Sequence, residues 1–224
     1  MGSLVLLHGL GATGRVWDGW AHPRMAPDLP GHGRAAALPQ YTFESMAAAV
    51  AEALPVRRGL VVVGHSLGGV LALELASGRH DVQVDRVIAL GVKVSWTDDE
   101  LAKAAALAQK PITWFDSRAD AATRYLKVSG LQGLVDPADE SVDQGLLEVD
   151  GRWRLAMDPA TFGVGAPNMP DLLAAAHADV VLARGELDPM NTDAELSALH
   201  DQTFTLPGLA HNAHVENPSA FTND

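Results

Sequence analysis

Short apolar runs bounded by glycine and proline alternate along this chain with longer segments whose apolar residues recur at helical spacing. Such alternation is typical of β-α-β units, in which parallel strands pack between helices on both faces of a sheet. We therefore predict an α/β fold with a mostly parallel sheet of about six strands flanked by helices. The expected strands are residues 4–7, 25–27, 60–63, 84–90, 180–183 and 202–206.

Helix signals fall between these runs, where the crossover connections of a parallel sheet belong. Apolar side chains recur at helical spacing in residues 42–54 and 67–77. A third helix is expected at residues 192–199, because Thr192 and Glu195 have the spacing of a capping box.

Residues 92–167 interrupt the alternation, because they show helical pattern but no apolar strand run like those on either side. We predict that they form a mainly helical cap inserted into a core made of residues 1–91 and 168–224. A capping box from Thr97 to Glu100 supports a helix near the start of this cap. Its aromatic residues either line a lid over a site or pack the cap onto the sheet: Trp96, Trp114, Phe115, Tyr125, Trp153 and Phe162.

The composition excludes several kinds of partner. The chain has 28 acidic and 16 basic residues, and its net charge of −12 repels phosphate backbones and anionic lipid. We therefore expect neither a nucleic-acid nor a membrane partner. There is no cysteine to form disulfides or thiolate metal sites, and we expect no metal and no cofactor. The first residues lack a basic segment and a long apolar run, which favours a cytoplasmic protein.

Gly64-His65-Ser66-Leu67-Gly68 lies between the clearest strand run and an apolar helical segment. A G-x-S-x-G sequence in this context predicts a nucleophile elbow, a sharp turn that presents the serine at the carboxyl edge of the sheet. Small residues must flank the serine because the turn crowds the backbone. The turn also aims the N–H groups of the helix N-terminus at the place where an oxyanion would form.

A serine hydroxyl is a strong nucleophile only when a base takes its proton and an acid orients that base. Asp188 follows a strand run and a glycine-containing turn, at the same sheet edge as the serine, and Glu186 lies two residues before it. The loop after the last strand offers two histidines, His211 and His214. The residues by themselves leave the choice of acid and of base open.

The order serine, aspartate, histidine and several short motifs resemble the α/β-hydrolase fold superfamily. The resemblance covers most of the chain outside the cap and implies the fold of that family. The motifs occur in the family's order: His8-Gly9, D-x-x-G-H-G at residues 28–33, G-x-S-x-G at 64–68, G-x-x-D-P at 185–189 and H-x4-E-x-P at 211–218. Several motifs in the correct order are far more specific than any one of them.

The resemblance implies a role for each matching residue. Ser66 is the nucleophile, His211 the general base and then acid, and Asp188 the group that orients His211. The backbone N–H groups of Leu67 and Leu10 form the oxyanion hole. In the family's motifs Asp188 is favoured over Glu186 and His211 over His214, and a metal site at the two histidines and Glu216 is disfavoured.

The chain also departs from the family pattern. Only three residues precede Leu4, so we expect the two antiparallel strands that usually open the sheet to be missing. An exposed sheet edge favours dimerisation or another cover, and we expect a monomer or a homodimer. Ala210 stands where the family usually has glycine before the histidine, which restricts the backbone there.

These motifs predict a serine hydrolase that cleaves a small carboxylic ester, lactone or related carbonyl compound through an acyl-enzyme. A carbon–carbon bond hydrolase, a thioester hydrolase, or a lyase or cyclase would use the same triad. A small-molecule receptor without turnover is a third interpretation. The expected substrate-binding residues are all in the cap: Trp96, Trp114, Tyr125 and Arg124.

Overall fold

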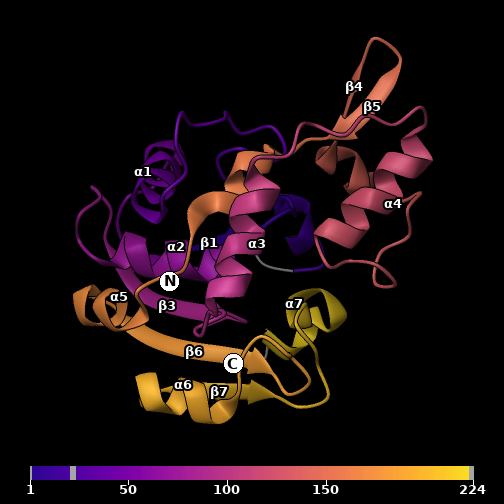
Figure 1. Cartoon of the computed structure of the whole chain (residues 1–224). Helices are drawn as coiled ribbons and strands as arrows, with labels where there is room; N and C mark the ends of the chain where they lie inside the picture. Colours follow the sequence, from indigo (N-terminus) through magenta and orange to yellow (C-terminus); the bar gives the residue numbers. More distant parts are fainter. Residues whose placement is uncertain (1, 21–23, 222–224) are drawn as a thin grey trace.

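The computed structural model describes residues 2–20 and 24–221. Its main sheet has five parallel strands in the order β1-β2-β3-β6-β7, which confirms the predicted α/β architecture (Figure 1). The strands are β1 (Ser3–Leu7), β2 (Leu60–His65), β3 (Val84–Leu90), β6 (Asp179–Gly185) and β7 (Thr203–Leu206).

The short strand expected at residues 25–27 is only a bridge. Met25 pairs with Val5 and exchanges hydrogen bonds with Leu4 and Leu6, but the pairing goes no further. Pro27 follows two residues later and has no N–H to extend a ladder. The sheet therefore has one strand fewer than the approximate number expected.

The helices are α1 (Phe43–Ala53), α2 (Leu67–Ala76), α3 (Asp98–Ala108), α4 (Arg118–Val128), α5 (Met169–Ala175), α6 (Asp193–Leu199) and α7 (Ala213–Glu216). Threonines cap three of them: the capping boxes begun by Thr42, Thr97 and Thr192 start α1, α3 and α6. In each capping box the Thr side chain accepts the N–H of the residue three positions later. The capping boxes at Thr97 and Thr192 were predicted from the sequence.

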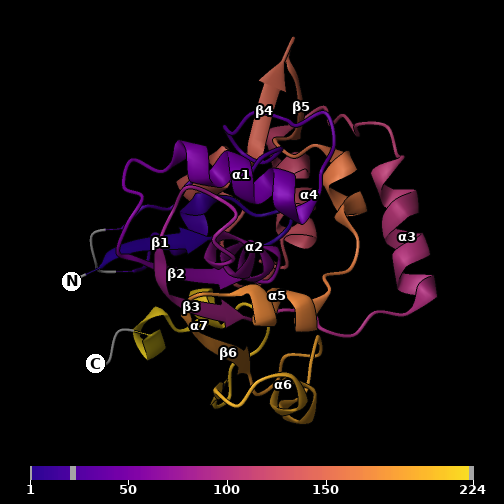
Figure 2. The same cartoon turned by 90° about the vertical axis from the view of Figure 1, so that its left-hand side faces the viewer.

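Both faces of the sheet are buried. Helix α2 packs on β2 and β3, and α1 and α5 pack against α2 (Figure 2). Val5 and Leu7 enter this core, while Leu6 points to the other face and packs with Trp17 and Trp20. Alternate residues of β1 therefore serve two cores, which is why the strand is continuously apolar.

The predicted cap contains a hairpin as well as helices. Strands β4 (Leu146–Val149) and β5 (Arg152–Leu155) pair antiparallel and project from the rest of the chain (Figures 1 and 2). Asp150 and Gly151 form the turn with φ of 50° and 76°. Asp-Gly is a strong signal for a two-residue hairpin turn, and this signal was missed because the strands are short. We propose that residues 92–167 form a cap, since α4 and this hairpin share a core around Tyr125, against which Val16 and Val215 also pack.

Candidate active site

The turn from β2 to α2 holds Ser66 in a conformation that side chains rarely adopt, with φ 51° and ψ −115°. Its N–H donates to the Leu90 carbonyl oxygen at 2.8 Å. A Cβ on Gly64 would collide with the backbone of Gly68, and one on Gly68 would collide with the backbone of Leu7. The small flanking residues therefore permit the strained turn that places Ser66 at the end of β2.

Asp188 and His211 form a buried pair at the same edge of the sheet. The Asp188 carboxylate is completely buried, and its Oδ2 lies 2.9 Å from the Nδ1 of His211. Its other oxygen accepts the N–H of Met190 at 2.9 Å. When Nδ1 of His211 donates to this carboxylate, Nε2 is the nitrogen free to accept a proton. Gly91 makes room for the pair, because a Cβ there would lie 3.1 Å from Asp188 and 3.3 Å from His211.

The alternative acid and base lie elsewhere. The ring of His214 is buried between Trp17 and His65, with centroids 4.3 Å from each. Neither of its nitrogens has a hydrogen-bond partner among residues 2–20 and 24–221, and burial lowers its pKa to about 3. Glu186 instead accepts the N–H of Gly208 at 2.7 Å. The structure thus pairs Asp188 with His211 and leaves His214 and Glu186 out of the pair.

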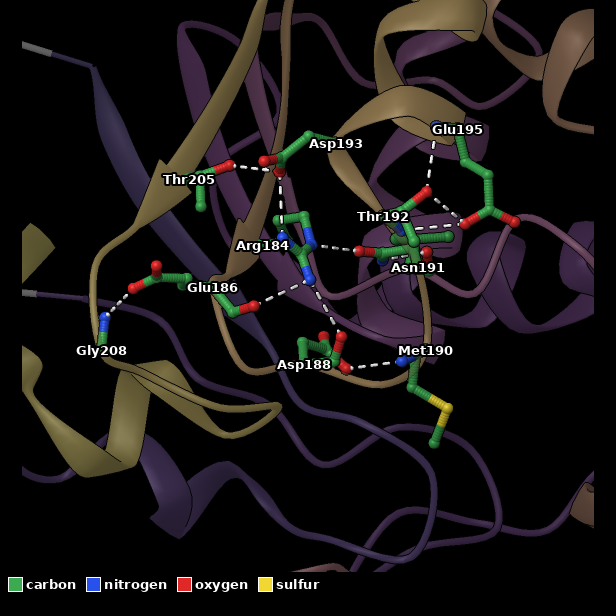
Figure 3. A network of polar contacts seen from close by, with 11 residues as sticks. Arg184, Glu186, Asp188, Met190, Asn191, Thr192, Asp193, Glu195, Thr205 and Gly208 are labelled. Carbon is green, nitrogen blue, oxygen red and sulfur yellow. Dashed lines mark hydrogen bonds and ion pairs between the residues drawn. The ribbon is translucent and has the colours of Figure 1, made fainter.

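Arg184 supports the loop that carries Asp188, and sequence reasoning missed it. Figure 3 shows its guanidinium among residues of this loop and the start of α6. It donates to the Asp188 carbonyl oxygen at 3.0 Å, to Asn191 Oδ1 at 2.9 Å and to Asp193 Oδ1 at 2.9 Å. Asn191 in turn donates to the carbonyl oxygen of Val92. An arginine within an otherwise apolar strand run was the only sequence signal for this network.

Two buried histidines hold the loop after β1. His8 Nε2 accepts the N–H of Leu29 at 2.9 Å, and His32 Nε2 accepts the N–H of Gly11 at 3.1 Å. Desolvation lowers their pKa values to about 4 and about 3, so both rings remain neutral acceptors. Both histidines therefore support turns of the chain. The N–H of Leu10 has no partner in the described part of the chain, as an oxyanion donor requires.

A pocket of about 160 Å³ lies beside Ser66. Its walls are mostly apolar and come from the site and the cap: Leu10, Phe43, Ser66, Leu67, Val70, Lys93, Trp96, Ala104, Phe162, Val164, Gly165 and Pro167. Lys93 is the charged residue among these, and its ammonium pairs with Glu100 at 2.9 Å and lies over the Trp96 ring. The pocket therefore favours an apolar group next to the serine.

The other cap residues expected to bind substrate are not in this pocket. Trp114 lies near the guanidinium groups of Arg152 and Arg154, each 5.9 Å from the centre of its ring. Tyr125 is buried in the cap core, where desolvation raises its pKa to about 12. Arg124 lines a separate cavity behind the pocket. Trp96 is thus the one of the four that lines the pocket beside Ser66.

Every helix within residues 2–20 and 24–221 is too short or too polar to span a lipid bilayer. Within the same residues, no group of three or more histidine, aspartate and glutamate side chains is arranged to hold a metal ion.

Comparison with known proteins finds a lipase, a synthase and an esterase that are similar to this chain. Lipase LipV of Mycobacterium tuberculosis is 32% identical over 167 residues, which cover 69% of this chain and 62% of the lipase. A 2-succinyl-6-hydroxy-2,4-cyclohexadiene-1-carboxylate synthase of Yersinia enterocolitica is 27% identical over 238 residues, covering 97% of this chain and 83% of the synthase.

An esterase of M. tuberculosis is 28% identical over 244 residues, covering 97% of this chain and 79% of the esterase. Its solved structure matches with a TM-score of 0.73 over 98% of this chain and 82% of that one. The model of the alpha/beta hydrolase family matches residues 4–224. The chain therefore belongs to the alpha/beta hydrolase family and is an esterase-like enzyme.

Proposed function

We propose that this enzyme is a serine hydrolase that cleaves a small carboxylic ester, lactone or related carbonyl compound through an acyl-enzyme on Ser66. The observation that carries the proposal is the buried pair of Asp188 and His211 at the sheet edge where the strained turn presents Ser66. A histidine oriented by a buried carboxylate is what activates a serine hydroxyl.

The proposed reaction has two stages, acylation of Ser66 and hydrolysis of the acyl-enzyme. Nε2 of His211 takes the Ser66 proton as the serine oxygen attacks the carbonyl carbon. The N–H groups of Leu67 and Leu10 donate to the oxyanion that forms. When the intermediate collapses, the carbon–oxygen bond to the alcohol breaks and His211 returns the proton to the departing oxygen. Water, activated by His211, releases the acid and restores Ser66.

Mass spectrometry of the intact protein after incubation with a small fluorophosphonate tests this proposal. One adduct is expected on the parent chain and none on Ser66→Ala or His211→Ala. Ser197→Ala, at an exposed serine of α6, serves as the matched control and should label like the parent. Ester turnover should fall by several orders of magnitude in each triad variant, and the double variant should be little worse. Additive losses would contradict a shared mechanism.

A second candidate is a lyase or cyclase reaction, or cleavage of a carbon–carbon or thioester bond, on the same residues. It is favoured by the similarity to the Yersinia synthase, which extends over 83% of that protein. A chain that forms the Ser66 adduct but hydrolyses no ester or lactone would support this candidate.

The location and the assembly of the enzyme also belong to the proposal. We propose a cytoplasmic enzyme that is a monomer or a homodimer and acts on small molecules. Cell fractionation and light scattering of the purified protein test these two points.

A further inference from the structure

The pocket beside Ser66 lies on one side of the serine. It includes Ser66, Leu10 and Leu67, whereas His211 and Asp188 are not among the residues that line it. In ester hydrolysis the departing alcohol must lie next to the histidine that protonates it. This pocket lies next to the oxyanion donors and not next to the histidine, and it is therefore the place for the acyl group.

The size of this pocket limits the acyl group. Its volume is about 160 Å³, and one water molecule, which is close in size to a methylene group, occupies roughly 30 Å³ in the liquid. An acyl chain of about four to six carbons fills such a space. Its walls are mostly apolar and the charge of Lys93 is paired with Glu100, which favours an uncharged chain.

Phe162 forms the wall at the cap end of the pocket. It lines the acyl pocket and also a second cavity of about 80 Å³ between α3, α4 and β5. Lys110 and Arg124 line this second cavity, and neither has an ion-pair partner in the described part of the chain. The remaining lining is apolar or uncharged: Leu107, Pro111, Ile112, Thr113, Val128, Leu155, Met157 and Pro159.

The segment that carries Phe162 is anchored on both sides. It is a 3-10 helix, Pro159–Val164, that packs against α3. The Thr161 hydroxyl donates to the Asp158 carbonyl oxygen at 2.7 Å, and the Asp158 carboxylate accepts the Tyr41 hydroxyl at 2.9 Å. The Phe162 ring is thus held in place between the two cavities.

We propose that Phe162 sets the length of the acyl chain by separating the acyl pocket from the second cavity. The inference rests on the proposed ester hydrolysis and specifies its substrate class, esters of short apolar carboxylic acids. Removal of the ring joins the two cavities. A longer acyl chain then fits, and a carboxylate at its far end meets Arg124 and Lys110.

The test is the chain-length profile of kcat/KM for p-nitrophenyl esters from acetate to decanoate. The parent enzyme should be most active on the esters in the range from butyrate through hexanoate. Phe162→Ala should shift the optimum to octanoate or decanoate, with a gain of about tenfold on these esters. Phe162→Leu keeps apolar packing in the segment and should shift the optimal chain length less than Phe162→Ala does. Ile112→Ala, which trims the second cavity and leaves the lining of the acyl pocket unchanged, is the matched control and should keep the parent profile.

The charged residues are tested with p-nitrophenyl monoesters of dicarboxylic acids of the same lengths. Phe162→Ala should gain activity on the longer monoesters, and adding Arg124→Gln should remove that gain while sparing the neutral esters. If Arg124→Gln lowered the activity on the monoesters and on the neutral esters equally, a role for Arg124 in binding the carboxylate would be overturned.

The outcomes separate the two proposals. An active parent whose profile persists in folded Phe162→Ala and Phe162→Leu overturns the role of Phe162 and leaves ester hydrolysis standing. A parent that neither labels at Ser66 nor hydrolyses any ester overturns the proposed function, and this inference with it.

Discussion

His65, the residue before the proposed nucleophile, contacts His211 in two ways. Its Nε2–H donates to the His211 carbonyl oxygen at 2.8 Å, and the two rings lie 4.6 Å apart. Burial, and then the nearby His214 and His211, lower the pKa of His65 well below its ordinary value. His65 therefore stays neutral beside His211, the proposed base, and it positions that ring without competing for the proton.

Replacement of His65 by leucine removes the donor and leaves the His211 carbonyl oxygen without its partner. We expect kcat for ester hydrolysis to fall about tenfold, equivalent to about 1.4 kcal/mol, with little change in KM. His65→Gln keeps an N–H donor and should recover part of the loss. Steady-state kinetics of both variants checks this, and equal losses would argue that the hydrogen bond is unimportant.

Arg184→Met should affect stability and catalysis together. It leaves the Asp188 carbonyl oxygen and Asn191 Oδ1 without this donor, and among the described residues Asp193 keeps only the Thr205 hydroxyl. We expect the free energy of unfolding to fall by about 3 kcal/mol. Because the loop of the proposed acid loosens, kcat should fall as well, at temperatures where the variant is folded. Urea unfolding and kinetics measure the two effects. Arg58→Met, at an exposed arginine, is the control and should change neither.

These contacts show where sequence reasoning reaches its limit at the scale of single residues. Ser66, Asp188 and His211 could be proposed from the sequence because each stands in a motif, although the choice of Asp188 over Glu186 and of His211 over His214 rested on the family resemblance. Arg184 and His65 depend on partners that the fold brings from distant parts of the chain. Periodicity and spacing carry no information about such partners.

Among the elements, the turn from β2 to α2 tolerates the least change. Gly68→Ala adds a Cβ that collides with the backbone oxygens of Leu7 and His8, and backbone has nowhere to move. We expect a loss of about 3 kcal/mol or more in the free energy of unfolding, together with loss of fluorophosphonate labelling. Gly133→Ala meets no atom within 4 Å and should cost only about 1 kcal/mol, from its positive φ. Equal stability of both variants by urea unfolding would contradict this.

The elements with strong local signals were predicted well, and those without were not. Capping boxes predict α3 and α6, and an apolar run predicts β3. These signals suffice because the hydrogen bonds and the burial of the three elements follow the local sequence pattern. The β4–β5 hairpin has strands too short for a clear alternation. Its arrangement depends on packing against α4, which the sequence alone does not reveal.

At the scale of the whole molecule, four buried histidines make stability depend on pH: His8, His32, His65 and His214. Each has a pKa in the folded chain below the ordinary value of 6.5. Below pH 6.5 the unfolded chain takes up protons that the folded chain does not. The fold is therefore fully stable above this pH and loses stability as the pH falls toward the folded-state values.

Below pH 6.5 the expected loss is about 1.4 kcal/mol per pH unit for each histidine. Since the loss begins only there, the free energy of unfolding should drop by about 5 kcal/mol between pH 7.5 and 5.5. Urea unfolding at the two pH values measures it. His214→Phe suits the packing between Trp17 and His65 and removes one titrating ring, so its pH dependence should be about one quarter weaker. A parent chain equally stable at both pH values would contradict the account.

Strands β3 and β6 are hydrogen-bonded neighbours in the sheet, although residues 92–167 lie between them in the chain. Near the two ends of this segment, Lys93 and Pro167 line the same pocket beside Ser66, so the ends lie close together at one edge of the sheet. Evolution can lengthen, shorten or replace the segment without disturbing the register of any strand. The chemistry of the sheet edge and the choice of substrate can thus diverge independently.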